Sequence, residues 1–236
     1  MRTSKQTQEK TRLKLIHAGI VLMTQNGYAK TTMRDISKHA KLSDTTIYRY
    51  FPTKDALVLG YIHLRHEEAI AKAEKIKDWS KLTLQEKLHT YFETILEGFL
   101  PERDFIQEAF EISYRALLTN YQEIRALNTL FLDHIRHILR SAIQKKEIPE
   151  QPIETVIPHL ILDAYLLIAL YWAKDTSKGF TNTTQIIDMS TGIMTGLLRE
   201  STLQKTIDLG YFLFRNHLFA HFNFGKEGPL NAFYQR

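Results

Sequence analysis

The stretch that decides the fold is residues 32–51, which read TMRDISKHAKLSDTTIYRYF. Thr31 or Thr32 is suited to cap a short helix that runs to about residue 40, because a threonine hydroxyl can accept a hydrogen bond from a free backbone N–H of the first turn. Ser43 is suited in the same way to cap the next helix, and Pro52 ends it. Two short helices joined by a tight turn are the geometry that places a helix in the major groove of DNA. The sequence therefore predicts a helix-turn-helix.

The second helix of this pair has an apolar side and a polar side. At about 100° per residue, Ile47 and Phe51 share one face and are expected to pack on Leu42 and Ile36. The opposite face consists of Thr45, Thr46, Tyr48 and Arg49. These side chains can donate and accept hydrogen bonds, and Arg49 can bind guanine O6 and N7 through two of them. The polar face is thus suited to bases and phosphates, and it holds no catalytic pair.

Helical spacing continues in both directions from this pair. A first helix is predicted from Gln8 to Asn26, with Gly27 in the position that favours a left-handed helix stop, and a fourth from 53 to about 77. Further helices are predicted at 82–99, 102–117, 120–146, 153–174, 183–199 and 203–222. No convincing alternating run of β-branched residues bounded by turn signals interrupts them. The sequence therefore predicts an all-α protein, with a three-helix head at residues 1–54 joined by a long helix to a helical body at residues 55–236.

The positive charge is concentrated near the N-terminus. The chain has a net charge of +5, yet residues 1–60 hold eleven lysines and arginines against four acidic residues. A basic N-terminal quarter on a near-neutral body is typical of a polyanion-binding module attached to a second unit. The alternative is a solvated surface whose charge asymmetry is accidental.

Composition excludes several classes of protein. Cysteine is absent, which excludes a disulfide framework, thiol catalysis and cysteine-ligated metal sites. The N-terminal residues MRTSKQTQEK lack the apolar stretch of a secretory signal. The longest apolar run, Ile157 to Ala173, contains His159 and Asp163 and is short for a membrane span. We therefore expect a cytoplasmic protein without a membrane partner.

The residues around the helix-turn-helix form an ordered series. It comprises Thr11-Arg12, Gly27-Tyr28, TTMRDI at 31–36, Ala40, Leu42-Ser43, TIYRYF at 46–51 and Lys54-Asp55-Ala56-Leu57. Over about residues 10–60 this series resembles the DNA-binding head of the TetR family of transcriptional regulators. The resemblance implies a homodimer that binds a palindromic operator in double-stranded DNA, more often as a repressor than as an activator. It also implies that the helical body binds a small-molecule effector, forms the dimer, and releases the DNA when the effector binds.

The resemblance also implies roles for single residues. Phosphate contacts fall on Thr32, Arg34, Tyr48 and Lys54, the last beside a helix N-terminus that itself favours anions. Operator preference falls on Asp44, Thr45, Thr46, Arg49 and Tyr50.

Three positions depart from the family pattern. Gly19 stands where the family usually has alanine, at a cost of about 0.5–1 kcal/mol inside a helix. Lys41 replaces the usual turn glycine, which costs on the order of 1 kcal/mol if the left-handed conformation is kept and is partly offset by its charge beside DNA. Asp44 replaces a basic or neutral residue; it either stabilises the helix dipole or accepts a hydrogen bond from a cytosine amino group.

Two segments of the body predict the dimer interface. Residues 153–174 are apolar nearly all round, and a helix of this kind must be covered on every side, which a partner subunit would do. The segment 183–199 offers a face of small residues for close helix approach, consisting of Ser190, Thr191, Gly192, Thr195 and Gly196. The alternative for both segments is a core within one subunit.

The effector is expected among the body helices. The polar candidates for its site, with one tryptophan, are Tyr91, Glu108, Tyr114, His134, Asp163 and Trp172. His134 lies on an apolar stripe, so a buried core histidine is the alternative there. Asp163 is either a polar residue of the dimer seam or an effector anchor.

The remaining motifs bear on other functions. His63-x-x-His66 with Glu67, and His134-x-x-His137, place two imidazoles one helical turn apart, which keeps a metal-responsive regulator as an alternative. An architectural DNA-binding protein without an effector is another. The motifs His-Glu-x-x-His, Gly-x-Ser-x-Gly and the P-loop are missing, so neither catalysis nor a cofactor is expected. The aromatic tail from Leu203 is expected to cover the body or to enlarge the dimer interface.

Overall fold

The computed structural model describes residues 4–109, 112, 122–150 and 155–199, together with the single residues 205, 209 and 212. Its α-helices are α1 (Lys5–Asn26), α2 (Met33–His39), α3 (Asp44–Tyr50), α4 (Lys54–Ala73), α5 (Leu84–Phe99), α7 (Gln122–Gln144), α8 (Ile157–Lys174) and α9 (Thr181–Arg199). Short 3-10 turns lie at Trp79–Lys81, Leu100–Glu102 and Lys178–Phe180, and residues 103–109 are helical. Within these described ranges there is no strand, and the all-α prediction is confirmed.

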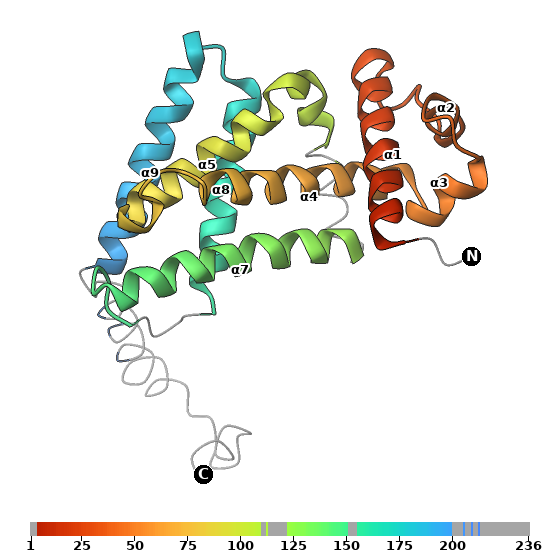
Figure 1. Ribbon diagram of the computed structural model, residues 1–236. Helices are drawn as coiled ribbons and strands as arrows, with labels where there is room; N and C mark the ends of the chain where they lie inside the picture. The colour runs from red at the N-terminus through yellow and green to blue at the C-terminus, as the bar shows by residue number, and fades with distance from the viewer. Residues whose placement is uncertain are drawn as a thin grey trace, which may run out of the picture.

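The head is built from α1, α2 and α3, which lie at one end of the molecule (Figure 1). Its core consists of fully buried aliphatic side chains, among them Leu15, Ile16, Ile36 and Ile47. From the head, α4 runs into the body as one continuous helix (Figure 1). Because Leu57 on α4 belongs to the same buried core, the head and α4 are packed together rather than joined by a linker.

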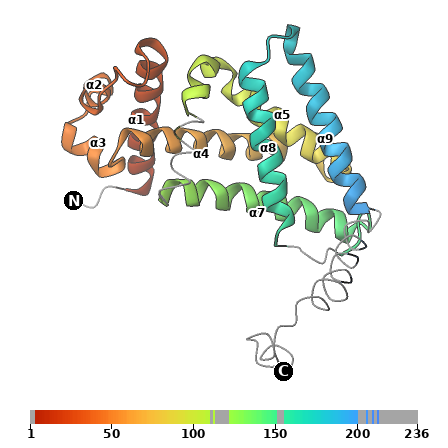
Figure 2. The ribbon, with the colours of Figure 1, turned by 180° about the vertical axis from the view of Figure 1, so that it is seen from behind.

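The body packs around α4. Its most extensive contacts are with α7 and α5, while α5 also packs on α9 and α8 packs on both α7 and α9. Figures 1 and 2 agree that α8 and α9 lie side by side, away from the head. By length and composition alone α8 is apolar enough to cross a membrane, and 39% of it is buried inside the described part of the protein.

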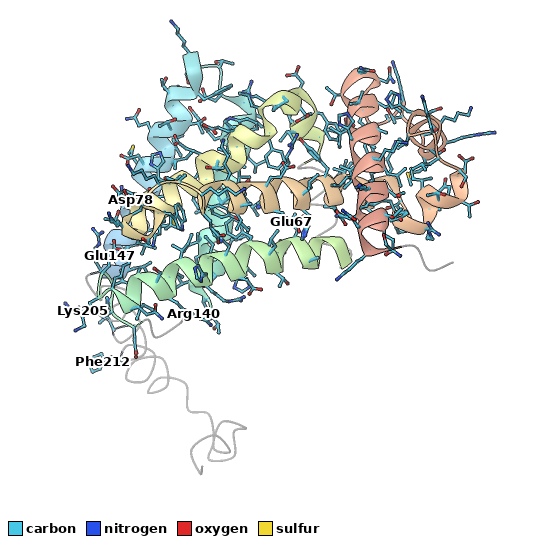
Figure 3. The ribbon with its side chains drawn as sticks, viewed as in Figure 1. Glu67, Asp78, Arg140, Glu147, Lys205 and Phe212 are labelled. Atoms are coloured by element: carbon cyan, nitrogen blue, oxygen red, sulfur yellow. The ribbon has the colours of Figure 1, made fainter. Side chains whose placement is uncertain are left out.

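Side-chain caps explain where these helices begin. Thr32 caps α2, Ser43 caps α3 and Thr53 caps α4, each accepting a hydrogen bond from a backbone N–H of the first turn. The start of α5 has an additional acceptor, because both Glu147 carboxylate oxygens lie 2.9 Å from the backbone N–H of Leu84. Glu147, labelled in Figure 3, lies just beyond the end of α7 and accepts a hydrogen bond from Arg199 at the end of α9.

The backbone conformation agrees with the sequence-based prediction at two turns and differs from it at a third. Lys41 has a φ of 54°, so the turn between α2 and α3 keeps the left-handed conformation. Phe51 is extended, as a residue before proline should be, and α3 ends there. Gly27 also has a positive φ, 82°, but its ψ of 152° lies outside the left-handed helical region, so the predicted stop is wrong in detail.

Gly19 permits close packing of α1 on α4. A Cβ at this position would lie 2.6 Å from Cδ2 of Leu57, closer than real Cβ atoms come. The helix propensity that glycine loses is therefore balanced by a contact that alanine would obstruct.

Several boundaries differ from the prediction. α4 ends at Ala73 rather than near residue 77, and Asp78, with a φ of 63°, then turns the chain into a 3-10 turn. α8 begins at Ile157 with Pro158 in its first turn, where proline is well tolerated. Tyr114 and the predicted helix 203–222, apart from residues 205, 209 and 212, lie outside the described residues.

Candidate DNA-binding site and buried aromatic cluster

The first turn of α2 is fixed by a reciprocal pair of hydrogen bonds. The Thr32 hydroxyl accepts from the Asp35 backbone N–H at 3.1 Å and donates to the Asp35 carboxylate at 2.6 Å. The Thr32 backbone N–H also donates to this carboxylate, and these bonds lower the pKa of Asp35. Thr32 therefore caps the helix while it remains exposed at the surface.

Asp44 joins α3 to α2. Its carboxylate accepts a hydrogen bond from the buried Ser37 hydroxyl and lies 3.7 Å from Arg34 Nε. The ion pair is largely exposed, so its contribution to stability is small. These contacts favour the structural interpretation of Asp44 over a hydrogen bond with cytosine. Arg34 remains exposed beside Asp44.

The outward face of α3 is polar, and most of it is exposed. Ile47 is fully buried beneath it, whereas Thr45, Tyr48 and Arg49 are exposed, Tyr48 to 55%. Within the described residues no hydrogen bond or ion pair holds the Arg49 side chain, which stacks its guanidinium 5.3 Å from the ring centroid of Tyr50. Thr46 and Tyr50 are half-buried, and Tyr50 packs on the core. Thr45, Tyr48 and Arg49 can therefore meet a groove without first breaking bonds within the described part of the protein, whereas the Thr46 hydroxyl is hydrogen-bonded to Ser43 at 2.8 Å.

Lys54 is placed differently from the prediction of a free phosphate contact. Its Nζ donates to the backbone carbonyls of Tyr28 at 2.5 Å and Thr31 at 2.7 Å, and lies 3.9 Å from the centroid of the Tyr28 ring. Two of its three donors are thus bound to the loop between α1 and α2 (residues 27–32). Partial burial lowers the pKa of Lys54. The ammonium group of Lys54 therefore makes its hydrogen bonds within the head.

Tyr28 is a residue whose importance the sequence did not reveal. Its hydroxyl donates to the Asp55 carboxylate, and its backbone N–H donates to Glu108 Oε2 at 3.2 Å. The prediction that Glu108 lines the effector site does not fit this contact, because its side chain reaches out of the body to the head. Because eighty residues separate Tyr28 from Glu108, no local sequence pattern predicts the contact.

The other effector candidates fall in three different places. Asp163 is exposed on α8, which favours the dimer seam over an effector anchor. Trp172 is buried but lines a pocket of about 220 Å³ between α5 and α9, next to Phe180. Tyr91 and His134 are both buried in the centre of the body, with ring centroids 4.5 Å apart.

Tyr91 and His134 belong to a larger aromatic cluster, which consists of His66, Tyr91, Phe131, His134 and Tyr165. The Phe131 ring lies at its centre, with centroids 5.7 Å from Tyr91, 5.9 Å from His66 and 5.3 Å from Tyr165. The sequence missed His66 and Tyr165 as members. The signal was present, since each lies at helical spacing from buried neighbours of its own helix, Ile62 and Ala69 for His66 and Ile161 and Ile168 for Tyr165.

Four polar atoms of the aromatic cluster are buried without a hydrogen-bond partner among the residues that the structure describes. They are His66 Nδ1, Tyr91 Oη, His134 Nε2 and Tyr165 Oη. Each such atom costs about 1–3 kcal/mol, so together they are comparable to a domain's whole stability of about 5–15 kcal/mol. Burial lowers the pKa of His66 to about 3 and of His134 to about 4, and it raises the pKa of both tyrosines. The cluster is therefore polar and uncharged at neutral pH.

Neither histidine pair brings its two imidazoles to one site: His134 is buried whereas His137 is exposed, and the first pair is divided between a buried and a partly exposed imidazole. His66 points into the aromatic cluster, whereas His63 lies 3.5 Å from Glu67. Among the residues that the structure describes, no three histidine or acidic side chains are arranged to hold a metal ion.

Comparison with known proteins assigns both parts of the chain to one family. Residues 15–61 match the family described as bacterial regulatory proteins, tetR family, and residues 87–213 match the tetracyclin repressor-like C-terminal domain. The uncharacterized HTH-type transcriptional regulator YuxN of Bacillus subtilis is 31% identical over 102 residues, which is 42% of this chain and only 33% of YuxN. The HTH-type transcriptional regulator UidR of Escherichia coli strain K12 is 24% identical over 193 residues, covering 78% of this chain and 93% of UidR.

A solved structure agrees in fold. FadR of Thermus thermophilus, a TetR-family transcriptional repressor in complex with lauroyl-CoA, has a TM-score of 0.59 and 22% identity, covering 78% of this chain and 92% of FadR. Because the C-terminal match alone spans more than half of the sequence and the N-terminal match covers the helix-turn-helix, the chain belongs to the TetR family of bacterial transcriptional regulators.

Proposed function

We propose that this TetR-family regulator is a ligand-responsive repressor that binds a palindromic operator as a homodimer and leaves it when a small-molecule effector binds. The observation that carries the proposal is the outward face of α3, where exposed Thr45, Tyr48 and Arg49 stand over a fully buried Ile47. The family consists of DNA-binding regulators and not of enzymes, and it is a family of soluble bacterial proteins, which supports a cytoplasmic location.

The proposed dimer rests on an exposed apolar surface, called here the α8/α9 face. It consists of Leu160, Leu167, Leu170, Tyr171, Met189, Ile193 and Leu197. Leu167 is 69% exposed and Ile193 is 63% exposed, although both are aliphatic and lie on neighbouring helices. Contiguous apolar surfaces of this kind mark interfaces, and a two-fold dimer presents the same surface from both subunits. We therefore assign the α8/α9 face to the second copy.

Three of the small residues of α9 support the alternative of packing within one subunit. Thr191 and Thr195 are buried, and their hydroxyls donate to backbone carbonyls of their own helix. A Cβ at Gly192 would lie 3.3 Å from Nε2 of Gln85 on α5. Gly192 thus allows α9 to approach α5 closely within one subunit, while larger aliphatic side chains are exposed.

Two links support effector control of the head. The first is α4, because Lys54 at its start holds the loop between α1 and α2 and His66 further along belongs to the aromatic cluster. The second is the hydrogen bond from the Tyr28 backbone N–H to Glu108. A change in the body therefore has two direct routes to the head.

Selection of bound sequences from random duplexes tests the DNA half of the proposal. We expect an enriched palindrome whose half-sites lie about 34–36 Å apart, one helical turn. The absence of any enriched palindrome would favour an architectural DNA-binding protein instead. Arg49→Ala is expected to relax specificity, and Arg49→Lys, which keeps the charge but cannot make the two-pronged contact with guanine, should relax it with little change in salt dependence.

A further inference from the structure

The aromatic cluster receives one polar side chain from each of four helices. His66 comes from α4, Tyr91 from α5, His134 from α7 and Tyr165 from α8. Within the described part of the chain, each of these side chains carries one buried atom that lacks a hydrogen-bond partner. Each of the four helices thus contributes one unsatisfied polar atom to the centre of the body. A ligand bound there could supply the missing hydrogen-bond partners.

The residue types make this arrangement specific. Phenylalanine in place of either tyrosine would keep the ring and remove the unsatisfied oxygen, so packing alone does not require the hydroxyls. Well-packed interiors satisfy nearly all of their polar atoms, and groups that stay unsatisfied call for an explanation such as a bound water or ligand. Tyr61 offers a contrast, because its hydroxyl donates to Glu102 at 2.7 Å.

The chemistry of the cluster restricts the ligand. The buried charged side chains of the described residues, Lys87 and Asp175, are bonded elsewhere, to Ser141 at 3.3 Å and to Thr183 at 2.6 Å. A buried ionic ligand would therefore lack a counter-charge, which is strongly unfavourable. The neutral imidazoles and phenols can instead donate to and accept from hydroxyl or carbonyl groups, and the surrounding rings favour a flat apolar frame.

We propose that the effector is a small, uncharged aromatic molecule with two or more hydroxyl or carbonyl groups, bound between α4, α5, α7 and α8 by His66, Tyr91, His134 and Tyr165. The inference rests on the proposed ligand-responsive function and names the chemical class of the ligand. An uncharged effector of this size would differ from a large anion such as lauroyl-CoA, which is bound in the FadR structure.

Binding of simple probes to the full-length protein tests the proposal. Resorcinol and hydroquinone represent the proposed class, while toluene lacks polar groups, benzoate carries a charge, and lauroyl-CoA is a large anion. We expect calorimetry to detect the two diphenols and to detect toluene and benzoate more weakly or not at all. Tyr91→Phe and Tyr165→Phe should each weaken diphenol binding about tenfold, the loss of one hydrogen bond. Equal affinity in the wild type and both variants, tighter binding of benzoate or lauroyl-CoA, or binding of neither diphenol would overturn the proposal.

The stability of the ligand-free variants provides a second test. Because the Tyr91 and Tyr165 hydroxyls have no hydrogen-bond partner in the described ranges, Tyr→Phe at either position should leave the urea midpoint unchanged or raise it. Tyr61→Phe is the matched control, and it should lower the midpoint because it breaks the hydrogen bond to Glu102. If all three variants lower the midpoint equally, the cluster hydroxyls are already satisfied and the ligand assignment is wrong. Neither measurement involves DNA, so a failure here is distinct from a failure to select an operator.

Discussion

Replacing Lys54 with methionine separates two roles for this residue. Methionine keeps most of the apolar stem and removes the ammonium group that holds the Tyr28 and Thr31 carbonyls at 2.5 and 2.7 Å. If Lys54 mainly stabilises the head, the variant should unfold more readily. If it mainly binds a phosphate, the variant should be as stable as the wild type and bind DNA with a smaller dependence on salt.

The magnitude follows from the contacts. A hydrogen bond from a charged group contributes about 1.5–3 kcal/mol. We take about 1 kcal/mol for each of the two Lys54 bonds, because solvent screens the half-exposed side chain and because partial burial of the ammonium group costs free energy. The interaction with the Tyr28 ring adds about 0.5–1 kcal/mol. We therefore expect Lys54→Met to lower the free energy of unfolding by about 2–3 kcal/mol. With a urea dependence of about 1–3 kcal/mol per molar, the midpoint shifts by roughly 1 M.

The matched control is Lys30→Met, which removes the same charge from an exposed position in the same loop. Urea unfolding and the salt dependence of operator affinity are measured for both variants. If Lys54 neutralises one phosphate, its replacement should reduce the steepness of the salt dependence by about 0.9. Equal unfolding midpoints for the two variants, combined with a reduction of that size for Lys54→Met alone, would refute the structural role.

Three further predictions concern the body and the head. Leu167→Glu places a charge on the α8/α9 face and should convert the dimer to monomers in analytical ultracentrifugation; an unchanged dimer would contradict the assignment of that face. Gly19→Ala should lower stability by about 1 kcal/mol, since overpacking against Leu57 costs about 1–3 kcal/mol and exceeds the gain of about 0.5–1 kcal/mol in helix propensity; a rise in the urea midpoint would count against it. Because His66 and His134 are held neutral, with pKa values of about 3 and about 4 against about 6.5 in the unfolded chain, acid protonates the unfolded state first. Stability should thus be fully present above pH 6.5 and fall towards pH 4, by up to about 1.4 kcal/mol per pH unit for each histidine; a flat profile in urea titrations over this range would show that these histidines are not buried.

Local chemistry made much of the head predictable. The caps at Thr32 and Ser43 depend on a hydroxyl and the backbone three residues later, so a short window of sequence contains all the necessary information. The same holds for Lys41, whose positive φ is required by the tight turn between two short helices. The buried Ile47 and exposed Arg49 follow from helical periodicity alone.

Side chains that bond across the fold could not be predicted in this way. The family resemblance assigns Lys54 to a phosphate, but its neighbours in space are two carbonyls more than twenty residues earlier. The helical pattern places Glu108 in the body, yet its carboxylate crosses to Tyr28. The sequence alone leaves Asp163 open between two roles, and only the packing of α8 on α7 and α9 decides which of the faces of α8 is exposed.

The position of α4 bears on the ligand-responsive function that we propose, because this helix connects the head to the body. Lys54 and His66 lie on the same unbroken helix, twelve residues and therefore on the order of 18 Å apart. A helix of this length moves as a rigid unit, so an effector that separates His66 from Phe131 and Tyr165 must also displace Lys54 relative to the rest of the body. Glu108 bonds to Tyr28 from the helical segment 103–109, so the loop between α1 and α2 is bound both to α4 and to that segment. If α4 moves relative to that segment, we expect one of these contacts to lengthen and the orientation of α2 and α3 to change with the loop that precedes them. Glu108→Gln, which keeps the size of the side chain but weakens its bond to Tyr28, should accordingly reduce the effect of an effector on operator affinity more than it reduces operator affinity itself.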